Sequence, residues 1–286
     1  MIPPILNLKV ENLYDNLDIN YVNNLNFNDL IFFPENHDNE NNPFNDLDFV
    51  SNCNYSPPPI SNYYDVTSFK EHVKKCDGSI FLFNNIASIP WNLEYFKSNY
   101  LYPMPTRLKI IGFCEAHLTK ESEPLYKIPN FKLLTNNNTG SKGGVALYVR
   151  NDIECEPIPE ITFMTNYIEC LFLKCNINKL NYIIGIIYRR PGSDQNAFLE
   201  KLKYILNKIQ TFKTRCILGG DINIDLIKHE HQPYVKEFVN TMFSYGYHPL
   251  IHKPTRVTSS SATLLDHIWV SNPEGTVGGC APKRCI

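Results

Sequence analysis

The sequence predicts an α/β fold, and three observations lead to this prediction. Short apolar runs such as residues 108–113 and 182–187 have the length and composition of buried strands. Segments with apolar residues at helical spacing lie between such runs, and in one of them Phe198 and Leu202 follow Asp194 on a single face. Polar residues recur where the strands are expected to end. Strands interleaved with helices in one large domain are therefore expected.

The elements are expected in a regular order along the chain. Strands are expected at 79–83, 108–113, 143–149, 168–175, 182–187, 215–218 and 264–270. A short helix is expected at 63–75. Further helices should begin at Pro90, after the cap residue Asp194 and near Val235, the last with Gly246 as its stop. Residues 254–263 are interpreted as a polar, serine-rich loop.

Charge divides the chain into an acidic arm and a mildly basic body. The net charge of the 286 residues is −2, but residues 1–75 hold 4 Lys/Arg against 11 Asp/Glu, and residues 76–286 hold 23 against 18. The first stretch is rich in Asn and Asp and lacks a sustained period, so a largely disordered arm is expected over 1–75. The body at 76–272 is compatible with a phosphate-containing partner.

The arm could also dock a protein partner. The tetrapeptide Phe-Asn-Asp-Leu occurs at 27–30 and again at 44–47. A repeated aromatic-acidic piece of this kind can act as a docking motif, although chance in an Asn-rich tract is the simpler explanation.

Cysteine usage and the lack of targeting segments indicate an intracellular protein. The nine cysteines are odd in number, and no Cys-x-x-Cys pair occurs. Free thiols in a reducing compartment and no structural zinc are therefore expected. No signal peptide is recognisable, and no apolar run reaches the ~18 residues of a membrane span. We expect no membrane association and no small-molecule cofactor.

A heptad at 219–225, Gly-Gly-Asp-Ile-Asn-Ile-Asp, follows a predicted buried strand. Its two glycines allow a sharp turn. If the chain stays extended, Asp221 and Asn223 point to the same side. An acid and an amide held there can orient a water molecule and accept its proton. The simpler alternative is a turn in which the Asp side chain bonds to the backbone.

Further oxygen-bearing side chains stand at other predicted strand ends: Asn85, Glu115, Tyr188 and Asp266. Strand ends hold functional groups rigidly in α/β proteins. Carboxylates and carboxamides that converge there suit Mg²⁺, which prefers oxygen ligands and retains waters. A Tyr hydroxyl can hydrogen-bond a developing oxyanion. Each residue alone has a structural explanation, but together they favour a metal-dependent site.

Six segments in a fixed order carry a family resemblance. They are Asn-Ile-Ala-Ser-Ile-Pro at 85–90, Ile-Gly-Phe-Cys-Glu at 111–115, Gly-Gly-Val-Ala-Leu-Tyr-Val at 143–149, Tyr-Arg-Arg-Pro at 188–191, Gly-Asp-Ile-Asn-Ile-Asp-Leu at 220–226, and the run from Pro-Thr-Arg-Val-Thr to Leu-Leu-Asp-His-Ile at 254–268. The region 79–272 resembles the endonuclease/exonuclease/phosphatase superfamily. Within it, the last segment is typical of the endonuclease domain of non-long-terminal-repeat (LINE-type) retrotransposons.

The resemblance implies a fold, an activity and a metal. The fold is a two-sheet α/β sandwich of the deoxyribonuclease I-like type, with the site between the sheet edges. The activity is hydrolysis of a phosphodiester bond, which nicks DNA, with Mg²⁺ or alternatively Mn²⁺. Glu115 matches the main metal ligand, with Asn85 beside it. An active enzyme of this kind would need access to the nucleus.

The resemblance also implies roles for the remaining site residues. Asp221 matches the residue that deprotonates the attacking water, supported by Asn223. Tyr188 matches a residue that hydrogen-bonds the scissile phosphate, and Asp266 matches a carboxylate that braces a catalytic His. A loop near DNA would contact phosphate through Thr255, Arg256 and Thr263.

The sequence departs from the family after the Asp266 strand. Family members continue to a Ser-Asp-His, and this motif does not occur here. His267 is no substitute, because adjacent residues on a strand point to opposite faces. We expect 273–286 to diverge, the last strand to be missing and a sheet edge to be open. Asp266 would then lack a cation-like partner, and nicking would be weak.

Functions other than DNA nicking are also compatible with parts of the sequence. The chain could be an inactive retrotransposon remnant or a non-catalytic binding protein. A phosphatase that acts on a small phosphoester is disfavoured by the segment at 254–266.

Overall fold

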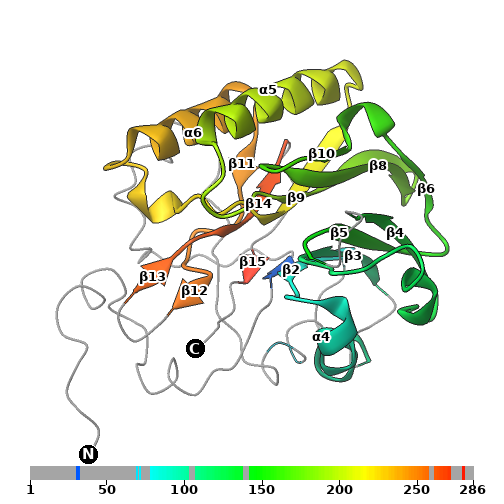
Figure 1. Ribbon diagram of the computed structural model, residues 1–286. Helices are drawn as coiled ribbons and strands as arrows, with labels where there is room; N and C mark the ends of the chain where they lie inside the picture. Colours follow the sequence, from blue (N-terminus) through cyan, green and yellow to red (C-terminus); the bar gives the residue numbers. More distant parts are fainter. Residues whose placement is uncertain are drawn as a thin grey trace, which may run out of the picture.

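Two β-sheets stacked face to face form the body of the protein in the computed structural model, and helices cover their outer faces (Figure 1). The structure describes residues 30–32, 69, 71, 78–102, 107–137, 142–257, 261–271 and 279–280. The arrangement confirms the predicted two-sheet α/β sandwich.

The first sheet has six strands, and its centre is the parallel pair β2–β3. In spatial order the strands are β15 (Gly279–Cys280), β1 (Leu30–Phe32), β2 (Ile80–Asn85), β3 (Leu108–Cys114), β5 (Val145–Arg150) and β4 (Phe131–Asn136). Helix α4 (Ile89–Phe96) packs on the outer face through Ile89, Leu93 and Phe96 and continues as a π-helical turn (Lys97–Leu101).

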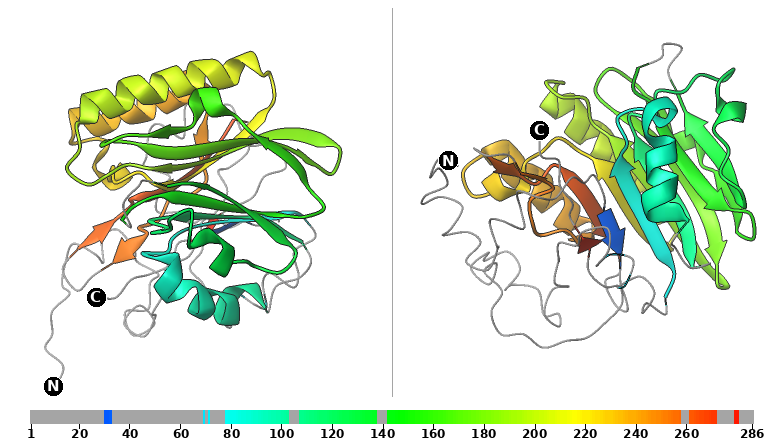
Figure 2. Two further views of the ribbon diagram at one scale, coloured as in Figure 1. Left: turned by 45° about the vertical axis from the view of Figure 1, so that its right-hand side comes forward. Right: turned by 90° about the horizontal axis from the view of Figure 1, so that it is seen from below.

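The expected open edge of a sheet is not found beside β2 in the described residues. β1 pairs antiparallel with β2, and β15 pairs with β1, so short strands from near both chain ends occupy this edge. Figure 2 shows β1, in blue, next to β2. The rest of the predicted arm at 1–75 and of the tail at 273–286 lies outside the described residues, as does most of the helix expected at 63–75, where residues 69 and 71 are helical.

The second sheet has seven strands, with β9 and β10 parallel and the other pairs antiparallel. In spatial order they are β11 (His248–Pro249), β14 (Asp266–Val270), β10 (Arg215–Asp221), β9 (Leu180–Tyr188), β8 (Glu169–Ile177) and β6 (Glu154–Pro157), with β7 (Phe163–Met164) also on β8. Helices α5 (Gln195–Thr211) and α6 (Pro233–Ser244) cover its outer face (Figures 1 and 2).

The helix boundaries follow the capping residues. Asp194 accepts hydrogen bonds from the backbone N–H groups of Asn196 and Ala197 at the start of α5, as predicted. Gly246, with φ 76°, follows α6 in the left-handed conformation of a C-terminal stop. Pro90 stands in the first turn of α4.

Gly219 and Gly220 belong to strand β10, so the sharp turn expected at these glycines is wrong. A Cβ atom at Gly219 would lie 2.2 Å from Cγ of Phe83 in the other sheet. At Gly220, with φ 140°, it would lie 2.0 Å from the Ile187 carbonyl oxygen. The two glycines let the sheets and neighbouring strands approach closely at the end of β10.

Several elements were not expected from the sequence. The serine-rich loop contains a two-stranded ribbon of β12 (Arg256–Val257) and β13 (Ala262–Thr263). The edge strands β4 and β6 and the short strands β7 and β11 were also missed, as were 3₁₀ turns at Glu123–Leu125, Pro159–Ile161 and Leu226–Lys228. In the described part of the chain, no helix is long and apolar enough to cross a membrane.

Candidate active site

Polar residues from both sheets meet at one end of the sandwich. Asn85 ends β2 and Glu115 follows β3, and because these strands are parallel their carboxyl ends share one edge. Tyr188 ends β9 and Asp221 ends the parallel β10 in the other sheet. Asp266 begins β14 and is the direct register partner of Asp221. The fold thus brings together the predicted strand-end residues.

Asn85 links the two sheets. Its Nδ2 donates to Glu115 Oε1 and to Asp221 Oδ2, each at 2.8 Å, while its Oδ1 accepts the Ala87 N–H at 3.1 Å. With this orientation, the amide nitrogen of Asn85 faces the two carboxylates. Asn85 is therefore a hydrogen-bond donor that holds Glu115 and Asp221 in one site.

Asp221 is the most deeply buried acid of the site, with 1% of its surface exposed. Its Oδ2 also accepts a hydrogen bond from Arg256, and its N–H lies 3.4 Å from Cys114 Sγ. Burial and then the charge of Asp266 raise the pKa of Asp221 to about 7, against the opposing effects of Arg256 and Asn85. A carboxyl with such a pKa changes protonation near neutral pH.

Arg256 lies between the two buried acids. It hydrogen-bonds Asp221, and its Nε is 3.7 Å from Asp266 Oδ2. Burial raises the pKa of Asp266, while the charge of Arg256 and a hydrogen bond with Thr255 oppose that rise. The expectation that Asp266 has no cation-like partner is wrong, because the Arg256 guanidinium takes that position.

Tyr188 and Glu115 complete the cluster. Tyr188 is 7% exposed, and burial followed by the charges of Glu115 and Asp221 raises its pKa, so the phenol stays protonated. Glu115 has φ 52°, and its side chain is 27% exposed, so one carboxylate faces outward at the rim. His117 Nε2 lies 4.0 Å from Glu115 Oε2 and was not singled out in the sequence.

The side chains of Asn223 and Asp221 do not point to the same side, because the chain turns at Asn223 (φ 53°) instead of staying extended. Its Nδ2 donates to the Arg189 carbonyl at 2.7 Å, and Arg189 Nη1 donates to the Asn223 carbonyl at 3.1 Å. The Asn223 N–H donates to Asp221 Oδ1 at 3.3 Å. The turn alternative is therefore present, and it orients the Asp221 carboxylate.

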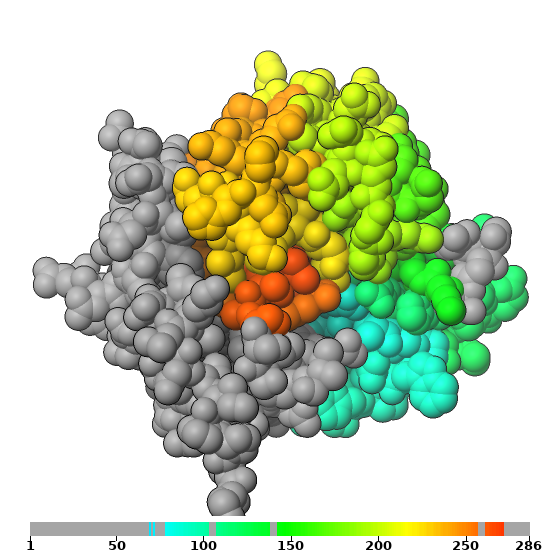
Figure 3. Space-filling model, turned by 60° about the vertical axis from the view of Figure 1, so that its left-hand side comes forward, coloured from blue at the N-terminus to red at the C-terminus, as the bar shows by residue number. Residues whose placement is uncertain are grey.

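The three residues expected near DNA are placed differently from one another. Thr255 is buried, and its hydroxyl accepts the N–H groups of Leu265 and Asp266 at 3.2 and 3.1 Å. Thr263 lies in β13 as the register partner of Arg256 and is partly exposed. Figure 3 shows this segment, in orange, at the surface between the regions of α6 and α4.

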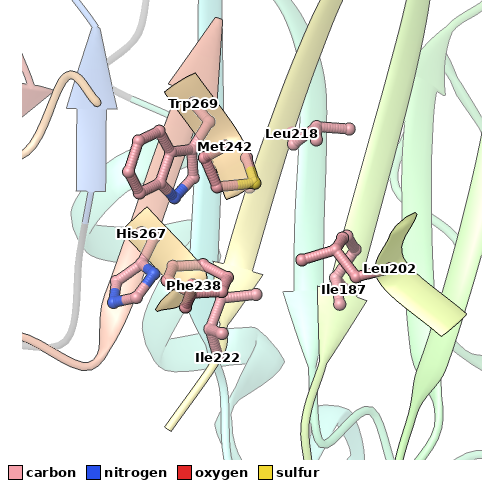
Figure 4. Close-up of a pocket in the computed structure, with 9 residues that line it drawn as sticks. Ile187, Leu202, Leu218, Ile222, Phe238, Met242, His267 and Trp269 are labelled. Atoms are coloured by element: carbon pink, nitrogen blue, oxygen red, sulfur yellow. The ribbon is translucent and has the colours of Figure 1, made fainter. Parts of the chain in front are cut away.

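His267 points away from Asp266, as expected from strand alternation. Its ring packs against Phe238 of α6, and Nε2 contacts the carbonyl oxygens of Ile224 and Leu264 at 2.9 and 3.2 Å. Figure 4 shows it beside a largely apolar cavity of about 10 Å³ under the helices. Burial lowers the pKa of His267 to about 4, so the ring is neutral and structural.

A buried ion pair behind the site was missed in the sequence. Glu169, fully buried, accepts hydrogen bonds from Arg190 Nε at 2.6 Å and from the Gly144 N–H at 2.5 Å. The Gly144 carbonyl accepts the N–H of Ala116, and the Gly143 carbonyl accepts the N–H of His117, the two residues that follow Glu115. The acid at the start of an apolar strand and the second Arg of Tyr-Arg-Arg-Pro were the available signals.

The donor set fits a hard cation bound at the rim. Glu115 offers a partly exposed carboxylate beside the neutral Asn85. Among the described residues, no group of three or more His, Cys, Asp or Glu side chains could hold a metal ion by itself. One carboxylate with open positions suits Mg²⁺, which keeps several waters and binds substrate phosphate rather than an all-protein cage.

Comparisons with known proteins agree with this fold. Residues 182–282 match the family described as endonuclease-reverse transcriptase. The fold is similar to the endonuclease domain of TRAS1, a telomere-specific non-LTR retrotransposon (15% identity, TM-score 0.51, 67% of this chain and 84% of that chain). It is also similar to the 3′-5′ exonuclease NExo from Neisseria meningitidis (13%, 0.50, 67% and 86%). No curated protein sequence matches the chain significantly.

A two-sheet sandwich with an acidic site at the strand ends is the architecture of a deoxyribonuclease I-like protein. The shared fold is of this type, and residues 182–282, about a third of the chain, match the endonuclease-reverse transcriptase family.

Proposed function

We propose that the protein hydrolyses phosphodiester bonds in DNA as a Mg²⁺-dependent, retrotransposon-derived endonuclease. The observation that carries this proposal is the convergence of Asn85, Glu115 and Asp221 through direct hydrogen bonds between the two sheets. The telomere-specific retrotransposon endonuclease and the 3′-5′ exonuclease that share the fold support a nuclease. Nicking of chromosomal DNA would require entry into the nucleus.

Glu115 is the residue that would hold Mg²⁺, or alternatively Mn²⁺, with Asn85 fixing its carboxylate. The bound ion would supply positive charge to the phosphate oxygens. Asp221 is the proposed base, because its buried carboxylate is oriented by Asn85 and by the Asn223 N–H. Tyr188 remains protonated and can donate a hydrogen bond to a phosphate oxygen.

Arg256 is the proposed phosphate contact of the β12–β13 ribbon. Its side chain is 37% exposed although it bridges Asp221 and Asp266. A guanidinium at the rim can bind a phosphate oxygen while it still neutralises a buried acid. Thr263 lies directly across the ribbon and is a second proposed contact, whereas Thr255 supports Asp266 from the interior.

Nicking of supercoiled plasmid DNA tests this function. We expect relaxation with Mg²⁺, none with a chelator, and a loss of ~10²–10⁴-fold for Asp221→Asn or Glu115→Gln. Asp152→Asn is the matched control, because this exposed acid pairs with Arg150 on the protein surface. Equal rates for all of these variants would refute the proposed site.

A non-catalytic binding protein is the second candidate, and one observation favours it. The partner of Asp266 among the described residues is Arg256, where the family pattern has a His. We propose that nicking is slow for this reason. Adding a C-terminal strand that carries Ser-Asp-His should raise the nicking rate, and equal nicking with and without it would refute the explanation. DNA binding without nicking in either form would support the second candidate.

A further inference from the structure

Two cysteines face each other on the neighbouring strands β6 and β8. Cys155 of β6 and Cys175 of β8 are direct register partners. Both side chains lie on the face of the second sheet that packs toward the first, with Cys175 buried and Cys155 half-buried at the rim. Both thiols are free.

The ladder around this pair brings the two side chains close together. Ile158 donates its N–H to the carbonyl of its opposite residue Phe172 at 2.9 Å, which makes that pair a hydrogen-bonded one. Pairs alternate along an antiparallel ladder, so Cys155 and Cys175 form a non-hydrogen-bonded pair. Such pairs have Cα atoms about 4.5 Å apart, within the ~4.4–6.8 Å range of a disulfide.

A lysine from the other sheet completes the arrangement. Lys132 of β4 donates its Nζ to the carbonyl of Ile153, two residues before Cys155, at 2.7 Å. The interaction with the neighbouring Cys175 thiol and then the nearby Lys132 ammonium lower the pKa of Cys155, against the opposing effect of burial. The interaction with Cys155 raises the pKa of Cys175. Cys155, which is also the more exposed of the two, is thus the more acidic thiol and the one that reacts first.

We propose that Cys155 and Cys175 are a redox-reactive dithiol that low-molecular-weight disulfides oxidise to an intramolecular disulfide. The Cys155 thiolate attacks one sulfur of the small disulfide, forms a mixed disulfide and releases one small thiolate. Cys175 then loses its proton and attacks Cys155 Sγ, which closes the protein disulfide and releases the second small thiol. From the Cys155 thiolate and the Cys175 thiol, the protein loses two electrons and one proton, and the small disulfide is reduced to one thiolate and one thiol.

The roles of the two cysteines differ, and this makes the proposal testable. The full chain would be treated with oxidised glutathione at neutral pH, blocked with N-ethylmaleimide, digested and analysed by mass spectrometry. A peptide pair linked through Cys155 and Cys175 is expected. Cys175→Ser should stop at a glutathione adduct on Cys155, and Cys155→Ser should leave Cys175 unmodified.

Two lysine variants separate the effect of Lys132 from general charge. Lys132→Met should slow alkylation of Cys155 at neutral pH at least ~10-fold, because the thiolate fraction falls as the pKa rises. Lys174→Met is the matched control, since Lys174 pairs with Glu156 and neighbours Cys175 on the opposite face of β8. Its alkylation rate should be unchanged.

Results with the unmodified chain alone can overturn the proposal. The proposal is refuted if Cys155 is alkylated no faster than free glutathione at the same pH. It is also refuted if a stable glutathione adduct on Cys155 persists and no disulfide to Cys175 forms. Equal slowing by Lys132→Met and Lys174→Met would remove the assigned role of Lys132.

Discussion

Asp221 should make the folded protein less stable as the pH rises from 5 to 8. Burial and the charge of Asp266 raise its pKa from 3.8 to about 7. In this window the unfolded chain has released a proton that the folded chain still holds, so the free energy of unfolding falls with increasing pH. For this one group the fall from pH 5 to pH 8 is about 2.5 kcal/mol, at about 1.36 kcal/mol per pKa unit.

Two histidines act in the opposite direction, so a matched comparison is needed. Burial lowers the pKa of both His252 and His267 to about 4. The stability from their neutral forms is present above their unfolded value of 6.5 and is lost as the pH falls toward 4. Urea unfolding of the unchanged chain and of Asp221→Asn at each pH isolates the carboxyl. The difference in unfolding free energy should fall by about 2–3 kcal/mol between pH 5 and pH 8.

Asp152→Asn serves as the control for loss of an acid. The hydrogen bond from Arg150 lowers the pKa of Asp152 to about 2, so its contribution changes only at lower pH. The slope between pH 5 and pH 8 should therefore be unchanged in this variant. A flat difference for Asp221→Asn, or one that rises with pH, would show that Asp221 is not a carboxyl with a raised pKa.

Three further substitutions test the packing around the site. Arg190→Met should cost about 3 kcal/mol in urea unfolding, because it leaves the buried Glu169 carboxylate without its cation; a loss below the measurement error would contradict this. Gly219→Ala should cost at least about 2 kcal/mol, since its Cβ would lie 2.2 Å from Phe83 Cγ, and an unchanged melting temperature would show that the sheets can move apart. Asp194→Ala should cost about 1 kcal/mol through loss of the α5 cap, which thermal unfolding would detect.

Central strands and long helices could be predicted from the sequence, whereas the edge strands could not. Strands such as β9 and β10 are buried on both sides and therefore have continuous apolar sequences. β6 is Glu-Cys-Glu-Pro, an edge strand of four residues that pairs with β8, and it is too short and too polar for an alternating pattern to be recognised. The pairing of β1 with β15 joins residues 31 and 280, and no local pattern encodes that contact.

The site could be predicted as a set of residues but not as a set of contacts. The strand-end residues do meet, and Asn85 reaches Asp221 across 136 positions of sequence. Periodicity locates a strand but does not say how it ends, so the left-handed backbone at Asn223 and the resulting reversal of its side chain were missed. For the same reason, Thr255 was placed on a loop surface although its hydroxyl bonds to the backbone under Asp266.

Arg256 changes the chemistry that the site can perform. Two adjacent buried carboxylates need a positive charge, and removing it would leave an uncompensated charge in the interior. An imidazole at that position could supply charge and also carry a proton, whereas a guanidinium stays protonated at any accessible pH. Burial lowers the pKa of Arg256, but the charges of Asp266 and Asp221 outweigh this effect, so the pKa is raised.

In the proposed hydrolysis, Arg256 can therefore stabilise negative charge but cannot exchange protons. Asp221 is then the one residue that removes the proton from water, and only its ionised form can act as the base. Because its pKa is about 7, only part of the molecules carry an ionised Asp221 at neutral pH. Slow nicking that accelerates with rising pH follows from this arrangement.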